Sequence, residues 1–275
     1  MMRSLWTAAS GMRAQQLNVD TIANNIANVN TTAYKSQEAS FKTLLYQNLQ
    51  STSTNNAGEN KPVPAEVGLG TRLSAITSQF DQGNLNASAR PFDVAIEGDG
   101  FFQVRNEAGE LVYTRDGTLN VSPVPGGNLL CTAAGLPVLD QNGNQIVLPG
   151  KYNASDVEID KNGYIGFPDA KGNFEPLMNN GYQVRLGLYQ FSNPAGLSKE
   201  GSNTFSVTAA SGEAMSEIGN PNLTPSLTHQ YYTEGSNVDV ANEMVNLIVA
   251  QRAYEMNSKA IQASDEMMQQ ANNLR

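Results

Sequence analysis

Residues 235–274 read GSNVDVANEMVNLIVAQRAYEMNSKAIQASDEMMQQANNL, with no proline and no glycine after Gly235. Apolar side chains recur here at every seventh position: Val240, Leu247, Tyr254, Ile261 and Met268. Such a repeat is typical of a helix that lays one continuous stripe against another helix. Ser236 and Asp239 can both accept hydrogen bonds from N–H groups of a first helical turn. The stretch therefore predicts a long C-terminal helix that begins close to these two residues.

The first thirty residues carry a matching repeat, formed by Leu5, Met12, Val19 and Ile26. Between Ser4 and Thr31 the only charged residues are Arg13 and Asp20, so the polar face consists of amides and hydroxyls. A helix that faces water normally carries many charges on its outer side. The pattern therefore predicts an N-terminal helix that is surrounded by other protein.

Two arrangements of these helices are consistent with the repeats. One is an antiparallel hairpin inside a single globular domain, and the other is a layer between subunits to which every copy contributes both ends. We favour the second, because two helices cannot cover all their apolar and amide faces by themselves. The nine heptad residues named above are then the predicted self-assembly seam. The ends of an isolated chain should be loosely held, since such helices gain most of their stability from packing.

The middle of the chain has a different pattern, with short β-rich runs between turn residues. Asn142-Gly143 and Asn162-Gly163 are dipeptides preferred where a hairpin needs positive φ. The predicted strands cover residues 92–96, 101–105, 111–114, 145–148, 157–159, 183–191 and 204–207. The predicted fold class is therefore α+β, with long terminal helices in a coiled-coil-like inner domain and a central, mostly antiparallel β domain that is closed or sandwiched.

These patterns divide the chain into four segments. They are an N-terminal helical segment (1–46), an extended linker or strap (47–85), the central β domain (86–230) and the C-terminal helix (231–275). Residues 51–60 have low complexity and predict a loop, and residues 67–76 are suited to an extended arm. A free segment of this composition would be disordered, whereas a strap between neighbouring subunits would be ordered in an assembly. The sequence leaves both interpretations open.

Composition excludes several functional classes. The chain has 26 acidic and 17 basic residues, a net charge of -9, one histidine and one cysteine. An acidic chain lacks the basic face that binds nucleic acid. Cys131 alone forms neither an internal disulfide nor a thiolate cluster, and His229 alone disfavours histidine-rich metal sites. No stretch reaches the roughly 20 apolar residues that span a bilayer, and the start lacks the apolar run of a signal peptide.

Residues that suggest chemistry have simpler structural interpretations. Asp140–Asn144 and Asp160–Gly163 resemble calcium loops but lack the glutamate at the twelfth position, so hairpin turns are favoured. Gly98-Asp99-Gly100 is interpreted as a tight turn, because no helix follows to bind a phosphate. His229 is interpreted as a surface residue in a linker, and Cys131 as a buried strand residue.

A carboxylate pair for glycoside hydrolysis could come from Asp93, Glu97, Asp99 and Asp116. The separation of the two carboxylates is diagnostic for that chemistry, and the sequence does not give it. We therefore expect no catalytic residue, no cofactor and no metal site.

Three motifs, in order along the chain, resemble the signatures of bacterial flagellar rod and hook proteins. They are residues 23–32 near the N-terminus, residues 93–102 with 113–117 in the β domain, and residues 236–239 with 243–255 near the C-terminus. The motif residues are Asn24, Asn25, Asn28, Asn30, Asp93, Gly98, Gly100, Phe101, Phe102, Arg115, Asp116, Gly117, Asn237, Asp239, Gln251, Arg252 and Tyr254.

Within that family, the length of the chain and residues 44–47 and 82–85 are most similar to distal rod proteins, with proximal rod and hook subunits as alternatives. Two departures are Ala33-Tyr34, where the family commonly has Gly-Phe, and a longer segment at residues 121–131. The resemblance implies a non-enzymatic subunit of a hollow helical shaft that transmits torque from motor to hook.

The resemblance also implies a location and partners. The chain would be exported unfolded by the flagellar type III apparatus into the basal body, where the rod spans the periplasm. Its partners would be copies of itself, proximal rod and hook proteins, and the surrounding basal-body rings, without nucleic acid or membrane insertion. A competing class is a secreted carbohydrate-binding β protein, which predicts an exposed aromatic platform in the β domain.

Overall fold

The computed structural model describes residues 2–50, 65–150, 156–168, 174–179, 181–221 and 223–273. They form two compact units, each considered separately below. The helical unit comprises Met1–Ala27, Gln37–Ser78 and Asp239–Arg275, and the β domain comprises Asn28–Ser36 and Gln79–Val238. The predicted loop at 51–60 lies outside the described residues.

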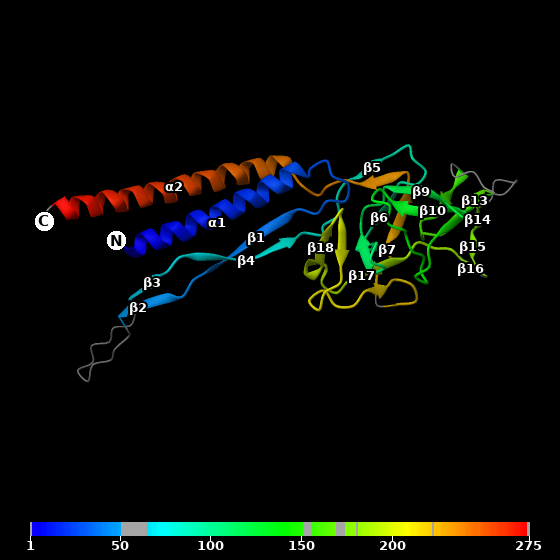
Figure 1. The fold of residues 1–275 in the computed structure, drawn as a ribbon, viewed down its shortest axis with the longest axis horizontal. Coiled ribbons are helices and arrows are strands. Elements are labelled where there is room, and N and C mark those ends of the chain that lie inside the picture. The colour runs from blue at the N-terminus through cyan, green and yellow to red at the C-terminus, as the bar shows by residue number, and fades with distance from the viewer. Residues whose placement is uncertain are drawn as a thin grey trace, which may run out of the picture. The chain divides into compact units, whose positions relative to one another are not determined.

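Two antiparallel helices, α1 (Met2–Ala27) and α2 (Val240–Asn273), form the longest part of the helical unit (Figure 1). With 34 residues, α2 is about 51 Å long at 1.5 Å per residue. Asp239 caps it, because its Oδ1 accepts the N–H of Ala241 at 2.9 Å. The predicted start of the C-terminal helix is confirmed, although Ser236 bonds Val238 rather than the first helical turn.

Within the predicted helical segment 1–46, α1 ends at Ala27 and residues 37–43 form a strand. Asn28 starts a turn in which its carbonyl accepts the N–H of Thr31, and Ala33 has a φ of 55°. In this run the Thr31 hydroxyl donates to Asn28 Oδ1 at 3.1 Å, and local bonding by asparagine and threonine side chains competes with helical hydrogen bonds.

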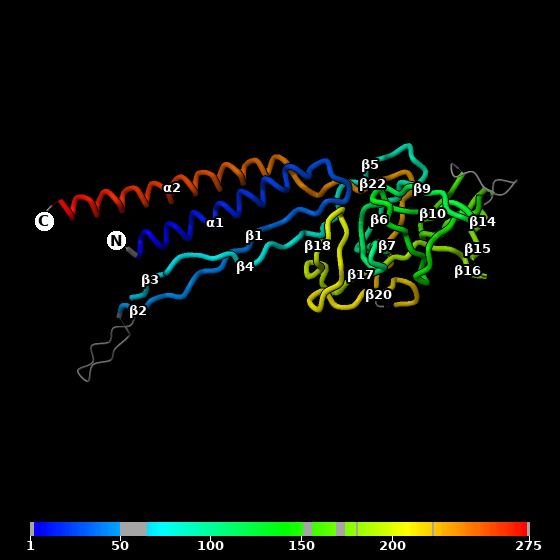
Figure 2. Tube along the Cα trace, in the orientation of Figure 1, coloured from blue at the N-terminus to red at the C-terminus, as the bar shows by residue number. Residues whose placement is uncertain are grey.

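Four strands complete the helical unit: β1 (Gln37–Thr43), β2 (Tyr46–Gln50), β3 (Ala65–Gly68) and β4 (Thr71–Ser78). β1 pairs antiparallel with β4, from Gln37 opposite Ser78 to Thr43 opposite Thr71, and β2 pairs with β3. The β1–β4 ribbon packs against α1, so that α1 lies between this ribbon and α2 (Figure 2).

The β domain consists of short strands, and all of its strand pairs are antiparallel. Its largest sheet has six strands in the order β18-β19-β8-β7-β17-β20. These are β7 (Phe101–Arg105), β8 (Leu111–Thr114), β17 (Leu188–Gln190), β18 (Ser198–Gly201), β19 (Thr204–Ser206) and β20 (Met215–Ser216).

The other strands form smaller sheets, and the 3-10 helix η2 covers Pro194–Gly196. The strands are β5 (Leu85–Ala87), β6 (Val94–Glu97), β9 (Leu119–Val124), β10 (Gly127–Thr132), β11 (Val147–Pro149), β12 (Glu158–Ile159), β13 (Ile165–Pro168), β14 (Phe174–Pro176), β15 (Met178–Asn179), β16 (Tyr182–Gln183), β21 (Leu227–Gln230) and β22 (Tyr232–Glu234).

The predicted α+β class is confirmed, with terminal helices and a central antiparallel β domain. Strands predicted at 101–105 and 111–114 coincide with β7 and β8, while the run 183–191 contains two separate strands. Both predicted turns are confirmed, with Gly143 and Gly163 at φ of 78° and 80°. The linker predicted around His229 is wrong, because this residue lies in β21 opposite Ala95 and its Nε2 is 2.6 Å from Glu97 Oε2.

Two apolar cores lie on either side of β7. Neighbouring residues of a strand point to opposite faces. Phe102 therefore joins the main core with Val94 and Ile96, while Phe101 joins an aromatic cluster with Tyr113 and Phe191. Cys131 is buried in β10, as predicted, and burial raises the pKa of its thiol.

Candidate functional site

Three charged side chains form a buried cluster in the β domain, here called the junction cluster: Lys35, Arg115 and Glu234. Glu234 Oε1 accepts a hydrogen bond from Lys35 Nζ at 2.6 Å, and its Oε2 accepts one from Arg115 Nε at 3.1 Å. All three side chains are no more than 1% exposed. Burial of charges is costly unless they are paired, and here one carboxylate pairs with two cations.

The junction cluster joins the chain segments that lead, in sequence, to the helical unit. Lys35 Nζ also donates to the carbonyl of Asp81 at 2.8 Å, and the Gly83 N–H donates to Glu234 Oε1 at 3.0 Å. Asn237 accepts the N–H of Ser36 and donates to the Gln79 carbonyl. The residues after α1, after β4 and before α2 are therefore bonded to one another.

The buried, charged surroundings of the cluster shift the pKa of Lys35. Burial, followed by the positive charge of Arg115, lowers the pKa of Lys35, and Glu234 opposes both effects. Arg115 donates further to the carbonyl of Gly98 at 2.7 Å and lies over the ring of Phe101. Because both carboxylate oxygens of Glu234 are used by protein groups, the cluster is suited to holding the chain together rather than to acid–base chemistry.

Three motif glycines of the β domain, Gly98, Gly100 and Gly117, lie in turns or close backbone contacts. Gly98 has a φ of 125° and turns the chain between β6 and β7, which confirms the predicted tight turn. At Gly100 the N–H donates to Ser226 Oγ. A Cβ on Gly117 would lie 1.7 Å from the carbonyl oxygen of Val94, so only glycine fits there.

Two of the acidic residues considered for a carboxylate pair, Asp93 and Asp116, accept local hydrogen bonds. Asp93 Oδ2 accepts the hydroxyl of Ser88 at 2.6 Å. Asp116 Oδ1 accepts both the N–H and the hydroxyl of Thr118, and burial raises the pKa of Asp116. In the part of the chain that the structure describes, no group of three or more His, Cys, Asp or Glu side chains is placed to hold a metal ion.

In the helical unit, Asn25 joins three elements. It is 1% exposed; its Nδ2 donates to the Gln37 carbonyl and to Glu243 Oε1, both at 2.8 Å, and its Oδ1 accepts the Gln37 N–H. This one amide therefore ties α1 to β1 and α2. Of the other N-terminal motif residues, Asn24 and Asn30 are exposed, and Asn28 Oδ1 accepts the hydroxyl of Thr31.

The structure brings most of the heptad residues together within one chain. Leu5, Met12, Val19 and Ile26 are half-buried along α1, as are Leu247, Ile261 and Met268 along α2. The contacts of this pairing include Ser4 Oγ to Ser264 Oγ at 3.3 Å. Val240 and Tyr254 remain exposed. Seven of the nine heptad residues are therefore partly covered within one chain, and other apolar side chains of α2 are more exposed.

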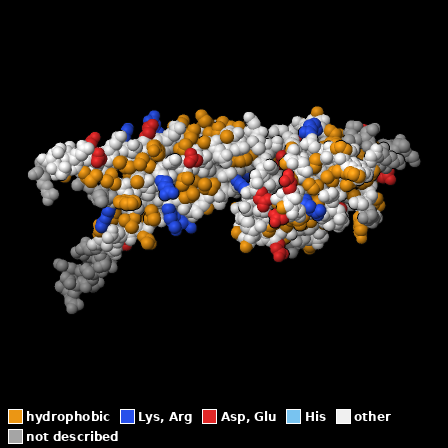
Figure 3. Space-filling model, viewed as in Figure 1, with side chains coloured by type: hydrophobic (Ala, Val, Ile, Leu, Met, Phe, Trp, Pro, Cys, Tyr) orange, Lys and Arg blue, Asp and Glu red, His pale blue; other side chains and the backbone are white. Residues whose placement is uncertain are grey.

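A second apolar row on α2 is exposed, and we call it the outer stripe: Met244, Val245, Ile248, Val249, Met256 and Met267. Val249 and Met256 are 61% and 64% exposed. Gln251 and Arg252, both motif residues, lie exposed in the middle of α2, where Arg252 pairs with Glu255 at 3.0 Å. Hydrophobic side chains are visible along the helical unit in Figure 3.

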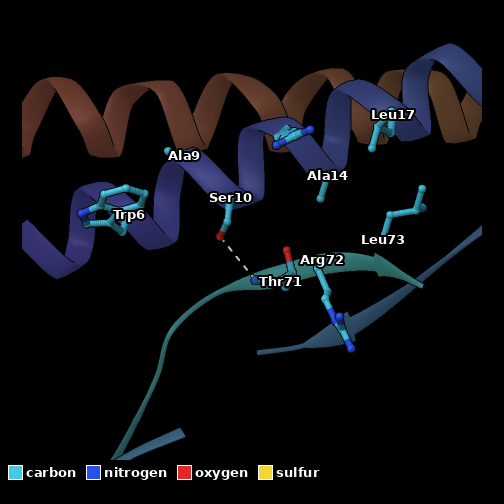
Figure 4. A pocket seen from close by; sticks show the side chains of 9 residues that line it. Trp6, Ala9, Ser10, Ala14, Leu17, Thr71, Arg72 and Leu73 are labelled. Atoms are coloured by element: carbon cyan, nitrogen blue, oxygen red, sulfur yellow. Dashed lines mark hydrogen bonds between the residues drawn. The ribbon is translucent and has the colours of Figure 1, made fainter. Parts of the chain in front are cut away.

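A groove of about 520 Å³ lies between α1 and β4. Its lining is mostly apolar, with Trp6, Ala9 and Leu17 from the helix and Leu73 from the strand (Figure 4). Ser10 Oγ accepts the N–H of Thr71 at 3.3 Å and connects the two walls.

Of the junction cluster, the sequence analysis singles out only the motif residue Arg115, and it misses Lys35, Glu234 and the residues of the groove. Lys35 and Glu234 have the pattern of ordinary surface charges, and Glu234 lies three residues before the motif residue Asn237. Trp6 lies outside the heptad rows, which is a signal of an exposed apolar residue. Leu73 joins the groove only because β4 pairs with β1, which the local pattern does not reveal.

Among the described helices, none is long and apolar enough to cross a bilayer.

Family models match three stretches of the chain. A model for flagella basal body rod proteins matches residues 5–35, one for the D1 domain of flagellar hook protein FlgE/F/G matches residues 95–167, and one for the C-terminal part of flagellar basal body rod FlgEFG proteins matches residues 229–274.

Curated relatives match the chain from end to end. The flagellar basal-body rod protein FlgG of Borreliella burgdorferi is 44% identical over 100% of this chain and 99% of its own length. FlgG of Caulobacter vibrioides is 40% identical over the full length of both chains. The flagellar hook-basal body complex protein FlhP of Bacillus subtilis is 33% identical, again over both full lengths.

Proposed function

We propose that this chain, which belongs to the FlgG family of flagellar basal-body rod proteins, is a structural subunit of the distal rod. The main support for this proposal is the similarity to FlgG proteins over the whole length of the chain, including both terminal helices and the β domain. The proposed location is the flagellar basal body. Proximal rod and hook subunits are the alternatives within the family, and we expect no catalytic activity.

The proposed mechanism rests on the helical unit. α1 and α2, from the predicted segments 1–46 and 231–275, form a coiled-coil-like inner domain around the axis of a hollow shaft. The β domain forms an outer layer. Contacts between two different surfaces of neighbouring copies generate an open helical array, and many such contacts let the shaft transmit torque without shearing. Proximal rod and hook proteins would continue the array, with the basal-body rings around it and the type III apparatus supplying the unfolded chain.

The segment 47–85 is proposed to bridge neighbouring subunits. Its described part carries exposed apolar residues in or beside the β2–β3 pair, namely Leu49, Val67 and Leu69. Exposed apolar clusters of this kind mark contacts with other protein. Deletion of residues 51–64 should give a shaft that bends or fails to assemble, and electron microscopy of straight, normal polymers from the deletion variant would remove this part of the proposal.

The outer stripe supplies the direct test of self-assembly. Val249→Asp combined with Met256→Asp should abolish polymer formation, because two carboxylates cannot be buried against an apolar neighbour. Circular dichroism of the soluble variant should show a folded β domain. Gln262→Asp, at an exposed polar position of α2, is the matched control and should assemble normally. Normal polymers from the double variant, measured by sedimentation and electron microscopy, would refute the proposed surface.

A further inference from the structure

The groove between α1 and β4 is an unpartnered surface of the helical unit. Trp6, on its edge, is 74% exposed, although indole is the largest apolar side chain of the chain. Ser10, Ala14 and Leu17 lie deeper, opposite Thr71 and Leu73. A mostly apolar groove beside an exposed tryptophan is a typical anchor site for a side-chain row from another helix.

The charges beside this groove indicate an acidic partner. Arg13 lies on the same face of α1 as Trp6, two turns further along, and also lines the groove. In β4, Arg72 stands directly opposite Lys42 of β1, which is an unfavourable like-charge pair. Within the described residues, neither arginine has an acidic group within 4.0 Å.

The C-terminal half of the outer stripe has the matching features. Met256 and Met267 are exposed and lie eleven positions apart, the same spacing as Trp6 and Leu17 along α1. At 1.5 Å per residue, each row is about 16 Å long. Methionine adapts to irregular apolar grooves. Glu266 lies beside Met267, and among the described side chains it too lacks an ion pair.

We propose that the groove of one copy binds the C-terminal half of the outer stripe of α2 from a second copy. The two helices run in the same direction, so that Met256 contacts Trp6, Met267 lies at Leu17 and Glu266 reaches Arg13. Groove and stripe are different surfaces, so each copy uses one of each and the contact repeats without closing. This inference rests on the proposed function and assigns the two surfaces of its helical contact.

The single tryptophan makes the contact measurable in the unmodified protein, because all indole fluorescence comes from Trp6. On assembly, the emission should shift to shorter wavelength and quenching by acrylamide should fall. A polymer whose Trp6 remains as accessible as in the soluble chain would overturn the inference while leaving the proposed function intact. Failure of the unmodified chain to polymerise at all would overturn both.

Charge-reversal variants test whether α2 of a second copy is what binds in the groove. Arg13→Glu and Glu266→Arg should each reduce assembly, and the double variant should restore it, because the reversed pair again attracts between copies. The matched control is Arg13→Glu combined with Glu97→Arg, which places the new charge in the β domain and should not restore assembly. Assembly unaffected by Arg13→Glu, or no recovery in the double variant, would show that another surface occupies the groove.

Cysteine cross-linking then tests proximity. In a Cys131→Ser background, Ala9→Cys and Ala260→Cys are placed in separate, differently tagged chains, so any adduct between them is intermolecular. Both positions are exposed. A mixed adduct should form in polymers and not in dilute soluble chains. Adducts only between two Ala9→Cys chains, or only between two Ala260→Cys chains, would indicate a symmetric contact and contradict the inference.

Discussion

The β domain buries its large apolar side chains, whereas the helical unit leaves many of them exposed. In the β domain, Val94, Ile96, Phe101 and Phe102 are completely buried in cores that one chain completes. In the helical unit, only a few small or β-branched side chains are buried, while large residues such as Trp6 and Met256 are exposed. A domain with a closed core is stable alone, whereas a helical pair with a second exposed stripe gains its remaining stability from neighbours.

The largest expected effect concerns the β domain as a self-contained unit. Glu234→Gln removes the carboxylate that pairs with Lys35 and Arg115, and leaves two buried cations without a counter-charge. Breaking a buried pair in this way costs about 3–5 kcal/mol of stability. Chemical denaturation followed by β-domain signals measures the loss. Glu97→Gln, which removes the exposed partner of His229, is the control and should cost less than about 1 kcal/mol. Equal costs would contradict the role of the junction cluster.

The next effect tests the packing of the same domain. Gly117→Ala places a Cβ against the Val94 carbonyl, and the backbone must shift to relieve the overlap. Overpacking of this kind costs up to about 3 kcal/mol. At Gly150 an added Cβ meets nothing within 4 Å, so Gly150→Ala is the matched control and should be nearly neutral. Equal thermal stability of the two variants would contradict the described turn.

A smaller effect is expected when a buried and an exposed isoleucine of the helices are each replaced. Ile22 is 5% exposed and Ile248 is 55% exposed. In the soluble chain, Ile22→Ala should destabilise the helical unit by about 2 kcal/mol, and Ile248→Ala should change it by less than about 0.5 kcal/mol. In polymers, Ile248→Ala should instead raise the concentration needed for assembly. Helical circular dichroism and sedimentation provide the measurements, and an assembly threshold unchanged by Ile248→Ala would count against the outer stripe.

The sequence predicts the structure of the two units to different extents. β7, β8 and the two Asn-Gly turns follow from local patterns, since alternation and positive φ are properties of neighbouring residues. The sequence does not predict β21 and β22, because they pair with β6 and β5, which are distant in sequence. His229 illustrates this, as its strand exists only through pairing with β6.

The helical repeats predict both helices but not their partners. A heptad row specifies that a stripe is covered, and it does not specify whether the covering helix belongs to the same chain. In the structure, Leu247 and Ile261 are half-buried beside α1, while Val249 and Met256, which lie outside the heptad, are exposed. The sequence analysis names Arg115 as a motif residue but does not predict its pairing with Glu234 or the place of Lys35, since three charges from distant segments carry no local pattern.

The smallest effect is a pH dependence at Asp116. Burial raises its folded pKa above 3.8, so the folded state holds the proton more tightly than the unfolded state. The free energy of unfolding contributed by this group therefore falls as pH rises from 3.8 through the folded pKa. Asp116→Asn keeps the Oδ1 acceptor for Thr118 and should lack that fall. Denaturation midpoints across this pH range test it, and parallel curves for both proteins would contradict the assignment.

Hydrogen exchange followed by mass spectrometry, on the soluble chain and on assembled polymer, tests the central contrast most directly. We expect slow exchange of β7 and β8 in both states, because their core is complete in one chain. Amides of α1 and α2 should exchange rapidly in the soluble chain and become strongly protected in the polymer. Helices that are equally protected in both states would contradict the account, because neighbouring copies would then add nothing to their stability.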